Sequence, residues 1–555
     1  MTDFKKTGRN FIKSNGYFQI TLPENEPVKG YLPGSPERVA LKAELDRQLA
    51  NPIEVPIIIG GKEIRSGKKA KMICPHDHQK VLGEYYIAGE KELLLAIEAA
   101  EAAKSEWENM PWEHRATIFL KAADLLTGKY RAKLAAACML GQSKNPYQSE
   151  IDIICELADF LRFNPYYVQE IYKQQPNNSA GVWNRVEYRA LDGFVAAITP
   201  FNFTSIGGNL PTAPAMVGNT VLWKPSSTAV LSNYYFMQIL MEAGLPAGVI
   251  NFVPCQGVDF GKVVVSHPKM AGFHFTGSTA VFNGIWNQVG ANIDKYVTYP
   301  RLVGETGGKD FIFAHESADI EALTCAIVLG AFEYQGQKCS AASRAYIPES
   351  LWGPLKGRLE EEIAKIKMGD VRDFTNLMNA VIDHKSFQKI QKYIDYARKS
   401  ADAEIIIGGG CDDSVGYFVE PTVILAKTPT FKTLVEEIFG PVMTIYVYPN
   451  DKLEETLEAC DTATIYGLTG AIFAQDRAVI IKLAKALDHA AGNFYINDKP
   501  TGAVVGQQPF GGSRGSGTND KAGSAVNLNR WISQRAIKET LVPRTVVNYP
   551  YMGEE

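Results

Sequence analysis

The sequence predicts an α/β protein of two or three domains, built around a parallel sheet with helices on both faces. Two observations lead to this fold class. Apolar strand-like segments alternate with helix-like segments between residues 194 and 313, as they do in repeated βα units. The chain also has 555 residues, which is more than one hydrophobic core usually supports. Because ligands of such sheets bind beyond the carboxyl ends of the strands, the loops there are the first candidates for chemistry.

The amino-acid composition is that of an ordinary globular protein, with 46% hydrophobic and 21% charged residues. A net charge of −4 argues against a general affinity for nucleic acid or anionic membranes. No apolar run is long enough to span a bilayer. The eight cysteines form no CxxC pair, which is typical of free thiols in a reducing compartment. The basic residues 1–15 lack an apolar signal core, so we predict a cytoplasmic protein, with the mitochondrial matrix as the alternative.

The N-terminal part of the chain is predicted to be an arm followed by helices. Residues 5–49 mix proline, glycine and charge, which indicates an arm on the surface, and residues 56–61 read as a strand and turn. Amphipathic periodicity then predicts helices at 91–107, 114–142 and 147–163.

The spacing of apolar residues changes from a helical to an alternating pattern at residues 185–190, which predicts a half-buried strand there. Val186, Tyr188 and Ala190 alternate there with charged side chains. The exposed edge of such a strand needs a partner. The C-terminal residues 545–549 are one candidate and a second chain is the other, so we expect a homodimer or a higher oligomer.

The βα units begin at residue 194. One sheet is expected from strands at 194–198, 221–223, 249–253, 272–275 and 309–313. Its helices are expected at 229–243, near 259 and through 285. A second α/β unit follows Cys339, with a strand at 345–347 and a helix at 355–366.

Cys339 is the first candidate for chemistry. It follows an apolar helix-like run, residues 320–334, and a turn at Gly336. A thiol in this place is held on a rigid base and stays reachable, and its thiolate would be the nucleophile. Taken alone, the pattern also fits an inert packing cysteine, which is the commoner case.

Other candidates lie at the ends of predicted strands, and the residues alone leave their alternatives open. The amide of Asn202 could donate to an oxyanion or stabilise a turn. Lys224 could hold a ribose or phosphate, or point into solvent. Glu305 lies in a glycine-rich turn that suits a general base or a surface acid. Gly277 and Ser278 precede a helix whose N-terminus could admit a pyrophosphate.

Seven short motifs occur along the chain in the order PFNF, WKPS, FTGS, GETGGK, GQKCS, EEIFGP and PFGG. This order resembles the aldehyde dehydrogenase superfamily over nearly the whole chain. The longer strings at 193–204, 492–497 and 505–512 are similar to the delta-1-pyrroline-5-carboxylate dehydrogenases, also called L-glutamate γ-semialdehyde dehydrogenases. Since no proline-oxidising domain precedes these motifs, the monofunctional form of that family is expected.

The resemblance implies an aldehyde dehydrogenase fold with three parts. These are a Rossmann-like NAD-binding domain (1–177 and 199–325), an α/β catalytic domain (326–527), and a small β oligomerisation flap with a C-terminal tail (178–198 and 528–555). It also implies NAD-dependent oxidation of L-glutamate γ-semialdehyde to L-glutamate in proline catabolism, through a cysteine thiohemiacetal and a thioester.

The resemblance also implies roles for residues at the motif positions. Cys339 would attack the aldehyde, Asn202 and the Cys339 N–H would hold the oxyanion, and Glu305 would activate water. The implied NAD contacts are Phe201, Lys224, Ser226, Gly277, Ser278, Glu437 and Phe439. The implied substrate contacts are Glu156 for the α-ammonium, Phe203 and Phe510 for the methylene chain, and Ser340 with the backbone of Gly502 and Ala503 for the α-carboxylate.

Three positions depart from the family pattern. Many members have a glycine four or five residues after the position of Ser278, but this chain has Val-Phe-Asn-Gly at 281–284. The expected pyrophosphate contact is therefore weaker there. Ala503 stands where some relatives have serine, so one side-chain hydrogen bond to the carboxylate is lost. Ser227 stands where strict NAD users often carry glutamate, so use of NADP stays open.

Other functions remain as alternatives at this point. They are another semialdehyde dehydrogenase, a CoA-acylating one, or a non-catalytic binding protein on the same fold. Glu305 argues against the acylating branch, and Glu305 together with Cys339 and Asn202 argues against a non-catalytic protein. His76, Asp77 and His78 complete no familiar metal-ligand spacing, so a polar surface loop without metal is expected there.

Overall fold

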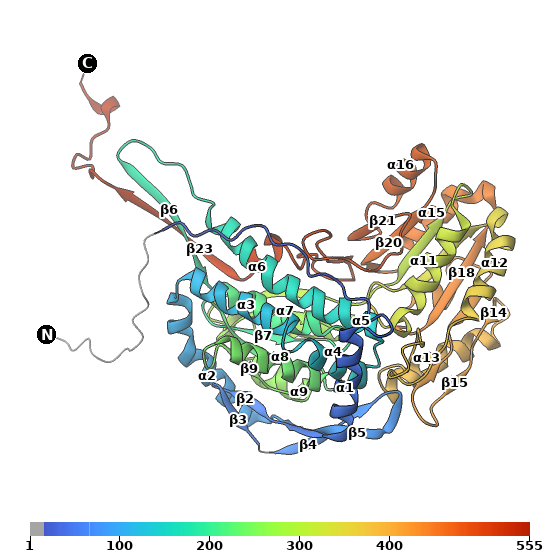
Figure 1. The fold of residues 1–555 in the computed structure, drawn as a ribbon. Helices are drawn as coiled ribbons and strands as arrows, with labels where there is room; N and C mark the ends of the chain where they lie inside the picture. Colours follow the sequence, from blue (N-terminus) through green and yellow to red (C-terminus); the bar gives the residue numbers. More distant parts are fainter. Residues whose placement is uncertain (1–15, 66, 555) are drawn as a thin grey trace.

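The computed structural model describes residues 16–65 and 67–554, so the expectation for the basic residues 1–15 lies outside the described residues. Two α/β lobes lie side by side, and a two-stranded arm projects from the first (Figure 1). The α/β class with parallel sheets is confirmed. None of the helices described in these ranges is both long and apolar enough to cross a membrane.

The N-terminal arm expected at 5–49 ends earlier than predicted. Residues 16–34 have no regular structure, but Ser35 accepts a hydrogen bond from Arg38 N and Pro36 occupies the first helical position. Helix α1 (Pro36–Ala50) therefore begins there. A small sheet follows, in the order β1 (Ile53–Val55), β5 (Asp77–Ile87) and β4 (Lys68–Cys74).

Two of the predicted long helices are broken. Residues 114–142 form α3 (Trp112–Thr127) and α4 (Arg131–Gln142), because Gly128 has non-helical angles of φ −98° and ψ −101°. Residues 147–163 form α5 (Pro146–Ser149), a π-helical turn (Glu150–Cys155) and α6 (Glu156–Tyr172). The wider π turn interrupts the regular 100° spacing, but Ile153, Ile154, Leu157, Phe160 and Leu161 are all buried.

The first lobe is built on a seven-stranded sheet in the order β11-β10-β7-β8-β9-β2-β3. The strands from β11 to β9 are parallel, and β2 and β3 are antiparallel. Its strands are β11 (Arg301–Glu305), β10 (Met270–Thr276), β7 (Phe194–Ile198), β8 (Thr220–Lys224), β9 (Ile250–Phe252), β2 (Ile57–Ile59) and β3 (Lys62–Ile64). The remaining helices of this lobe are α2 (Glu90–Asn109), α7 (Thr204–Met216), α8 (Val230–Ala243), α9 (Gly257–Phe260) and α10 (Thr279–Ala291).

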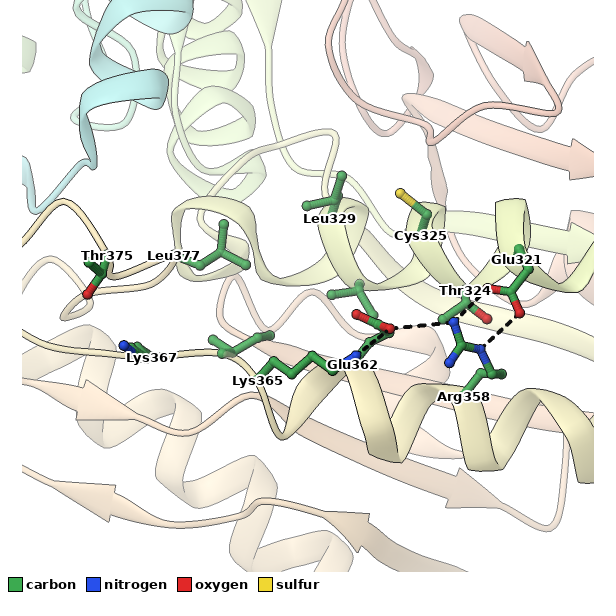
Figure 2. A pocket seen from close by; sticks show the side chains of 12 residues that line it. Glu321, Thr324, Cys325, Leu329, Arg358, Glu362, Lys365, Lys367, Thr375 and Leu377 are labelled. Atoms are coloured by element: carbon green, nitrogen blue, oxygen red, sulfur yellow. Dashed lines mark hydrogen bonds and ion pairs between the residues drawn. The ribbon is translucent and has the colours of Figure 1, made fainter. Parts of the chain in front are cut away.

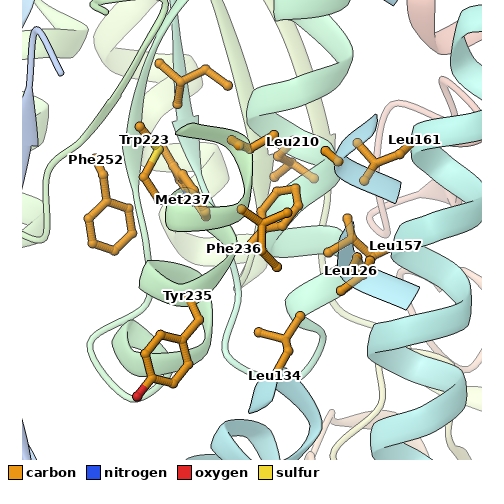
Figure 3. Close-up of a cluster of buried hydrophobic side chains, with 14 of the residues drawn as sticks. Leu126, Leu134, Leu157, Leu161, Leu210, Trp223, Tyr235, Phe236, Met237 and Phe252 are labelled. Atoms are coloured by element: carbon orange, nitrogen blue, oxygen red, sulfur yellow. The ribbon is translucent and has the colours of Figure 1, made fainter. Parts of the chain in front are cut away.

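A hydrophobic cluster joins the helices to this sheet (Figure 3). Leu126 of α3, Leu134 of α4 and Leu157 of α6 are buried with Trp223 of β8 and Phe236 of α8. Burying one such side chain stabilises the fold by about 1.5–3 kcal/mol. The cluster therefore holds α6 firmly against the lobe whose strand ends carry the predicted binding loops.

The second lobe has its own seven-stranded sheet, in which all strands except β14 are parallel. The order is β14 (Ala403–Ile407), β17 (Thr422–Ala426), β18 (Val442–Tyr448), β13 (Ala342–Pro348), β12 (Asp310–Ala314), β20 (Thr469–Phe473) and β21 (Asn493–Ile496). The helices are α11 (Ile320–Phe332), α12 (Glu349–Ile363), α13 (His384–Lys399), α14 (Lys432–Val435), α15 (Leu453–Thr462) and α16 (Arg477–Ala486), whereas α17 (Ala525–Asn529) packs against α6 of the first lobe. Two short pairs complete the fold, β15 (Cys411–Asp412) with β16 (Phe418–Val419) and β19 (Tyr466–Gly467) with β22 (Ser513–Arg514).

Residues 309–313 do not complete the first sheet as predicted. Strand β12 pairs with β13 and β20 in the second sheet, and β11 is the fifth parallel strand of the first. The chain changes lobe at Gly307 and Gly308. An added Cβ on Gly308 would lie 2.2 Å from Cys339 O, so only glycine permits this close passage.

The strand expected at 185–190 forms as β6 (Val182–Ala190), but its predicted partner is wrong. It pairs antiparallel with β23 (Ile532–Thr540) of the same chain, whereas residues 545–549 lie outside any strand. Trp531 directly before β23 is buried, and its carbonyl accepts a hydrogen bond from Asn219 Nδ2 at 2.9 Å. This anchor in the first lobe aligns the residues after Trp531 with β6.

Candidate active site

Cys339 follows a strained turn at the end of α11. Tyr334, Gln335 and Gly336 have positive φ angles of 50°, 56° and 64°. An added Cβ on Gly336 would lie 2.2 Å from Gly440 O, so a glycine is required at that point. Such strain persists only where the surroundings hold it, and it is typical of functional sites.

Two cavities meet at Cys339, which lines both of them. One, of about 460 Å³, lies at the carboxyl ends of β7, β8 and β10, and we call it the strand-end cavity. The other, of about 360 Å³, lies between α6 and residues 499–510, and we call it the α6 cavity. Molecules bound in the two cavities could therefore meet at a single sulfur atom.

All seven residues predicted to contact NAD line the strand-end cavity. They are Phe201, Lys224, Ser226, Gly277, Ser278, Glu437 and Phe439. The five residues from Phe201 to Ser278 lie at strand ends of the first lobe. Glu437 and Phe439 belong to the second lobe, so the cavity lies between the lobes. The rings of Phe201 and Phe439 meet edge to face at 5.9 Å across it.

The chemistry of this lining fits a dinucleotide. Lys224 supplies an amine, and α10 begins directly after Ser278, where free N–H groups favour phosphate. The carboxylate of Glu437 accepts a hydrogen bond from Gly308 N at 2.9 Å, and burial raises its pKa. Val281, in the segment that departs from the glycine pattern of the family, also lines the cavity. Its branched side chain therefore lies in the first turn of α10.

All six predicted substrate contacts line the α6 cavity. They are Glu156, Phe203, Ser340, Gly502, Ala503 and Phe510. Ser340 Oγ lies 2.8 Å from Thr501 Oγ1, which ties the residue after the thiol to the loop that carries Gly502. Aromatic, hydroxyl, backbone and carboxylate groups thus converge on one cavity with the sulfur in its wall.

Glu156 lines the α6 cavity with a carboxyl that is harder to ionise than an ordinary one. Burial raises its pKa to about 8, opposed by Ser205 and by Lys144 and Lys338. Ser205 Oγ lies 2.6 Å from both Asp152 O and Glu156 Oε2. The hydroxyl has one proton and a carbonyl can only accept, so a protonated Glu156 that donates to Ser205 satisfies both contacts.

Asn202 lines the same cavity as Cys339 and already makes one hydrogen bond. Its buried Nδ2 donates to Gln337 O at 3.1 Å. An amide NH₂ has two protons, so the second remains available for an oxyanion at the sulfur. Asn202 and Cys339 both line the strand-end cavity, which agrees with the predicted pairing.

Glu305 ends β11, and its Oε2 accepts a hydrogen bond from Gly512 N at 2.9 Å. Burial raises the pKa of Glu305 well above its ordinary value, opposed by the Gly512 hydrogen bond and Lys521. Burial likewise raises the pKa of Cys339 well above its ordinary value, and Asp310 and Glu305 add to the shift. Burial therefore makes both groups harder to ionise than the same groups in water.

Figure 2 shows a third cavity, of about 430 Å³, between α11 and α12. Arg358 donates to both carboxylate oxygens of Glu321, at 2.9 and 2.6 Å, and lies 3.5 Å from Glu362, so these charges largely neutralise one another. Cys325 also lines this cavity. None of the predicted site residues does, so we assign no chemistry to it.

The polar surface loop predicted around His76 is wrong for that residue. His76 is only 3% exposed, its Nδ1 lies 2.9 Å from Ser143 Oγ, and burial lowers its pKa to about 4. Sequence reasoning also missed the N-terminal arm, since Asn25 and Val28 line the α6 cavity. No local pattern in the sequence connects these residues with that site.

Comparison with known proteins identifies the family of this chain. Residues 63–537 match the Aldehyde dehydrogenase family. The mitochondrial delta-1-pyrroline-5-carboxylate dehydrogenase of Dictyostelium discoideum is 54% identical, with 99% of each chain covered. Its Homo sapiens counterpart, also named mitochondrial, is 50% identical over 95% of this chain and 94% of the relative.

Solved structures show the same likeness. The crystal structure of the Delta-pyrroline-5-carboxylate dehydrogenase from Mycobacterium tuberculosis bound with NAD is 51% identical, with a TM-score of 0.94. It covers 98% of this chain and is itself covered completely, at 100%. A Thermus 1-pyrroline-5-carboxylate dehydrogenase with bound NAD is 31% identical, with a TM-score of 0.89 over 94% of this chain and 100% of the other.

Proposed function

Because this chain belongs to the aldehyde dehydrogenase family, we propose that it oxidises L-glutamate γ-semialdehyde to L-glutamate with NAD, in proline catabolism. The observation that carries the proposal is that Cys339 lines both cavities. One cavity has the lining expected for a dinucleotide, and the other has the lining expected for an amino-acid aldehyde. The names of the relatives and the NAD in their structures support this substrate and cofactor.

The α6 cavity recognises the amino-acid end of the substrate. Glu156, once ionised, accepts hydrogen bonds from the α-ammonium. Ser340 and the N–H groups of Gly502 and Ala503 donate to the α-carboxylate. Ala503 has no hydroxyl, so it contributes its backbone alone. Phe203 and Phe510 pack against the methylene chain and exclude water, which leaves the aldehyde at Cys339.

Reaction begins when the Cys339 thiol gives up its proton to solvent water and the resulting thiolate Sγ attacks the aldehyde carbon. A C–S bond forms, and the carbonyl electron pair moves to oxygen. The second N–H of Asn202 Nδ2 and the Cys339 N–H donate to this oxyanion. When bound, NAD supplies the hydride acceptor that converts the thiohemiacetal into a thioester.

Glu305 then releases the product. Its raised pKa makes it a strong base for a carboxylate, and it takes a proton from water that attacks the thioester. The C–S bond breaks, and L-glutamate and the Cys339 thiol result. The Oε2 of Glu305 accepts a hydrogen bond from Gly512 N, which leaves Oε1 to take the proton from water.

Location and assembly form part of the same proposal. The relatives from Dictyostelium discoideum and Homo sapiens are named mitochondrial, which favours the mitochondrial matrix over the cytoplasm for this chain. A two-stranded ribbon is marginally stable by itself. The β6–β23 arm projects from the lobes with Trp183 half-exposed, which supports a homodimer in which a second copy covers it.

The test is NADH formation with delta-1-pyrroline-5-carboxylate, succinate semialdehyde and propanal. The amino-acid aldehyde should give a kcat/KM at least about tenfold above both others, because one charge-assisted hydrogen bond alone contributes about that much. A higher kcat/KM with succinate semialdehyde would assign the chain to another branch of the family. Failure to form NADH with any aldehyde would refute the enzyme assignment.

A further inference from the structure

The N-terminal arm passes beside the substrate rather than merely over the surface. Residues 16–34, dark blue in Figure 1, run along α6 and the π-helical turn. Asn25, Glu26 and Val28 line the α6 cavity together with Glu156 and Gly502. A segment more than a hundred residues from either thus forms one wall of the site.

Asn25 links the arm to the two elements that face the substrate. Its Nδ2 donates to Asp159 Oδ2 of α6 and to Val505 O, both at 2.8 Å. Its Oδ1 accepts a hydrogen bond from Gln507 Nε2 at 2.9 Å. One side chain therefore bridges the helix that carries Glu156 and the loop that carries Gly502 and Ala503.

The arm itself is held firmly, so Asn25 has a fixed position. The Glu26 carboxylate accepts hydrogen bonds from Arg131 at 2.8 Å and from Arg162 at 2.6 Å. The Glu26 N–H donates to Asp159 Oδ1 at 2.7 Å. With both carboxylate oxygens engaged by the arm, Asp159 serves as an attachment point on α6 rather than as a substrate contact.

The loop at 501–507 is a segment whose position such a bridge would set. Gly502 and Gly506 have φ angles of 105° and 82°, which few other residues adopt. Val505 packs against Phe160 and Phe163 of α6. This apolar contact holds the loop against the helix but does not by itself fix its position along the helix. Asn25 adds two directional contacts to this loop, because its side chain donates to Val505 O and accepts a hydrogen bond from Gln507 Nε2.

We propose that Asn25 is a positioning residue for the amino-acid end of the substrate. It sets the place of the Gly502 and Ala503 N–H groups relative to Glu156. An α-amino acid carries its ammonium and carboxylate on one carbon, so the groups that bind them must keep a fixed separation. The inference rests on the proposed function, because an aldehyde with neither group would not sense the loop.

The experiment compares Asn25→Ala with Leu22→Ala, a control on the same arm whose side chain is 63% exposed. KM and kcat are measured for glutamate γ-semialdehyde and for propanal with NAD. The inhibition constant of L-glutamate against propanal serves as a binding readout. For Asn25→Ala we expect KM for the semialdehyde and the glutamate inhibition constant to rise about tenfold, since displaced N–H groups lose about one hydrogen bond. The KM for propanal, and kcat for both aldehydes, should stay within a factor of two of the wild type, roughly the spread between exposed-site variants.

A second variant, Asn25→Asp, keeps the shape and the acceptor for Gln507 but loses the donor to Val505 and to Asp159, and it places a second carboxylate beside Asp159. It should show the same selective rise in KM. Equal losses on both aldehydes, unchanged constants, or loss of folding in both Asn25 variants would overturn the proposal. If the wild-type enzyme itself does not prefer the semialdehyde to propanal, the proposed function fails first, and this outcome is distinct from the others.

Discussion

The charge of Glu156 gives the sharpest test of substrate recognition, through the substitution Glu156→Gln. The amide has the same shape and can donate to Ser205 as the protonated acid does, so the variant should fold normally. It cannot become an anion, so it cannot form a charge-assisted hydrogen bond with an ammonium. The substitution therefore removes recognition without removing packing.

The magnitude depends on pH in a definite direction. A charge-assisted hydrogen bond is worth about 1.5–3 kcal/mol, or a factor of roughly 10 to 150 in affinity. At pH 7, ionising a carboxyl whose pKa is raised to about 8 costs about 1.4 kcal/mol, which cancels one decade of that gain. Above the raised pKa the cost disappears. Amino-acid affinity of the wild type should therefore rise as pH increases from 6.5 to 8.5.

The assay is inhibition of propanal oxidation by L-glutamate, because glutamate carries the ammonium and carboxylate and does not cyclise. The loss of affinity in Glu156→Gln should be about tenfold greater at pH 8.5 than at pH 7, since the ionisation cost is about one decade per pKa unit. Asp152, Lys144 and Lys338 also affect the pKa of Glu156. Substitution of any of them should therefore shift the pH at which the affinity for glutamate rises. A loss that is equal at both pH values, or equal for propanal itself, would refute the reasoning.

The remaining predictions concern the thiol, the base and the assembly. Cys339→Ala should abolish NADH formation while NAD binding stays intact, and Cys325→Ala in the third cavity should stay active; activity in the first variant would remove Cys339 from the mechanism. Glu305→Gln should give a burst of NADH of up to one equivalent followed by slow turnover, because thioester hydrolysis lacks its base; a linear time course at the wild-type rate would contradict this. Removal of residues 544–555, in which Val547 is 89% exposed, should weaken a homodimer measured by light scattering; a full-length monomer at micromolar concentration would contradict that assembly.

The sequence by itself determined most of the local structure and the chemical identity of the site. Strands β7, β8 and β10 and helix α8 were readable, because apolar alternation and a closing glycine such as Gly244 act over a few residues. The predicted cofactor residues lie in the family motifs, as do the substrate residues Phe203, Ser340 and Phe510, whereas Glu156, Gly502 and Ala503 lie outside them. Their sorting into two cavities agrees with the resemblance, but their roles stay predictions until the variants are measured.

Only the tertiary structure decided which distant segments meet. Strand β12 joins the second sheet and β23 pairs with β6, because strand partners depend on contacts far apart in sequence. The π-helical turn before Glu156 and the arm at Asn25 follow from packing that no local period encodes. The raised pKa of Glu156 has the same origin, since burial is a property of the surroundings and not of the residue.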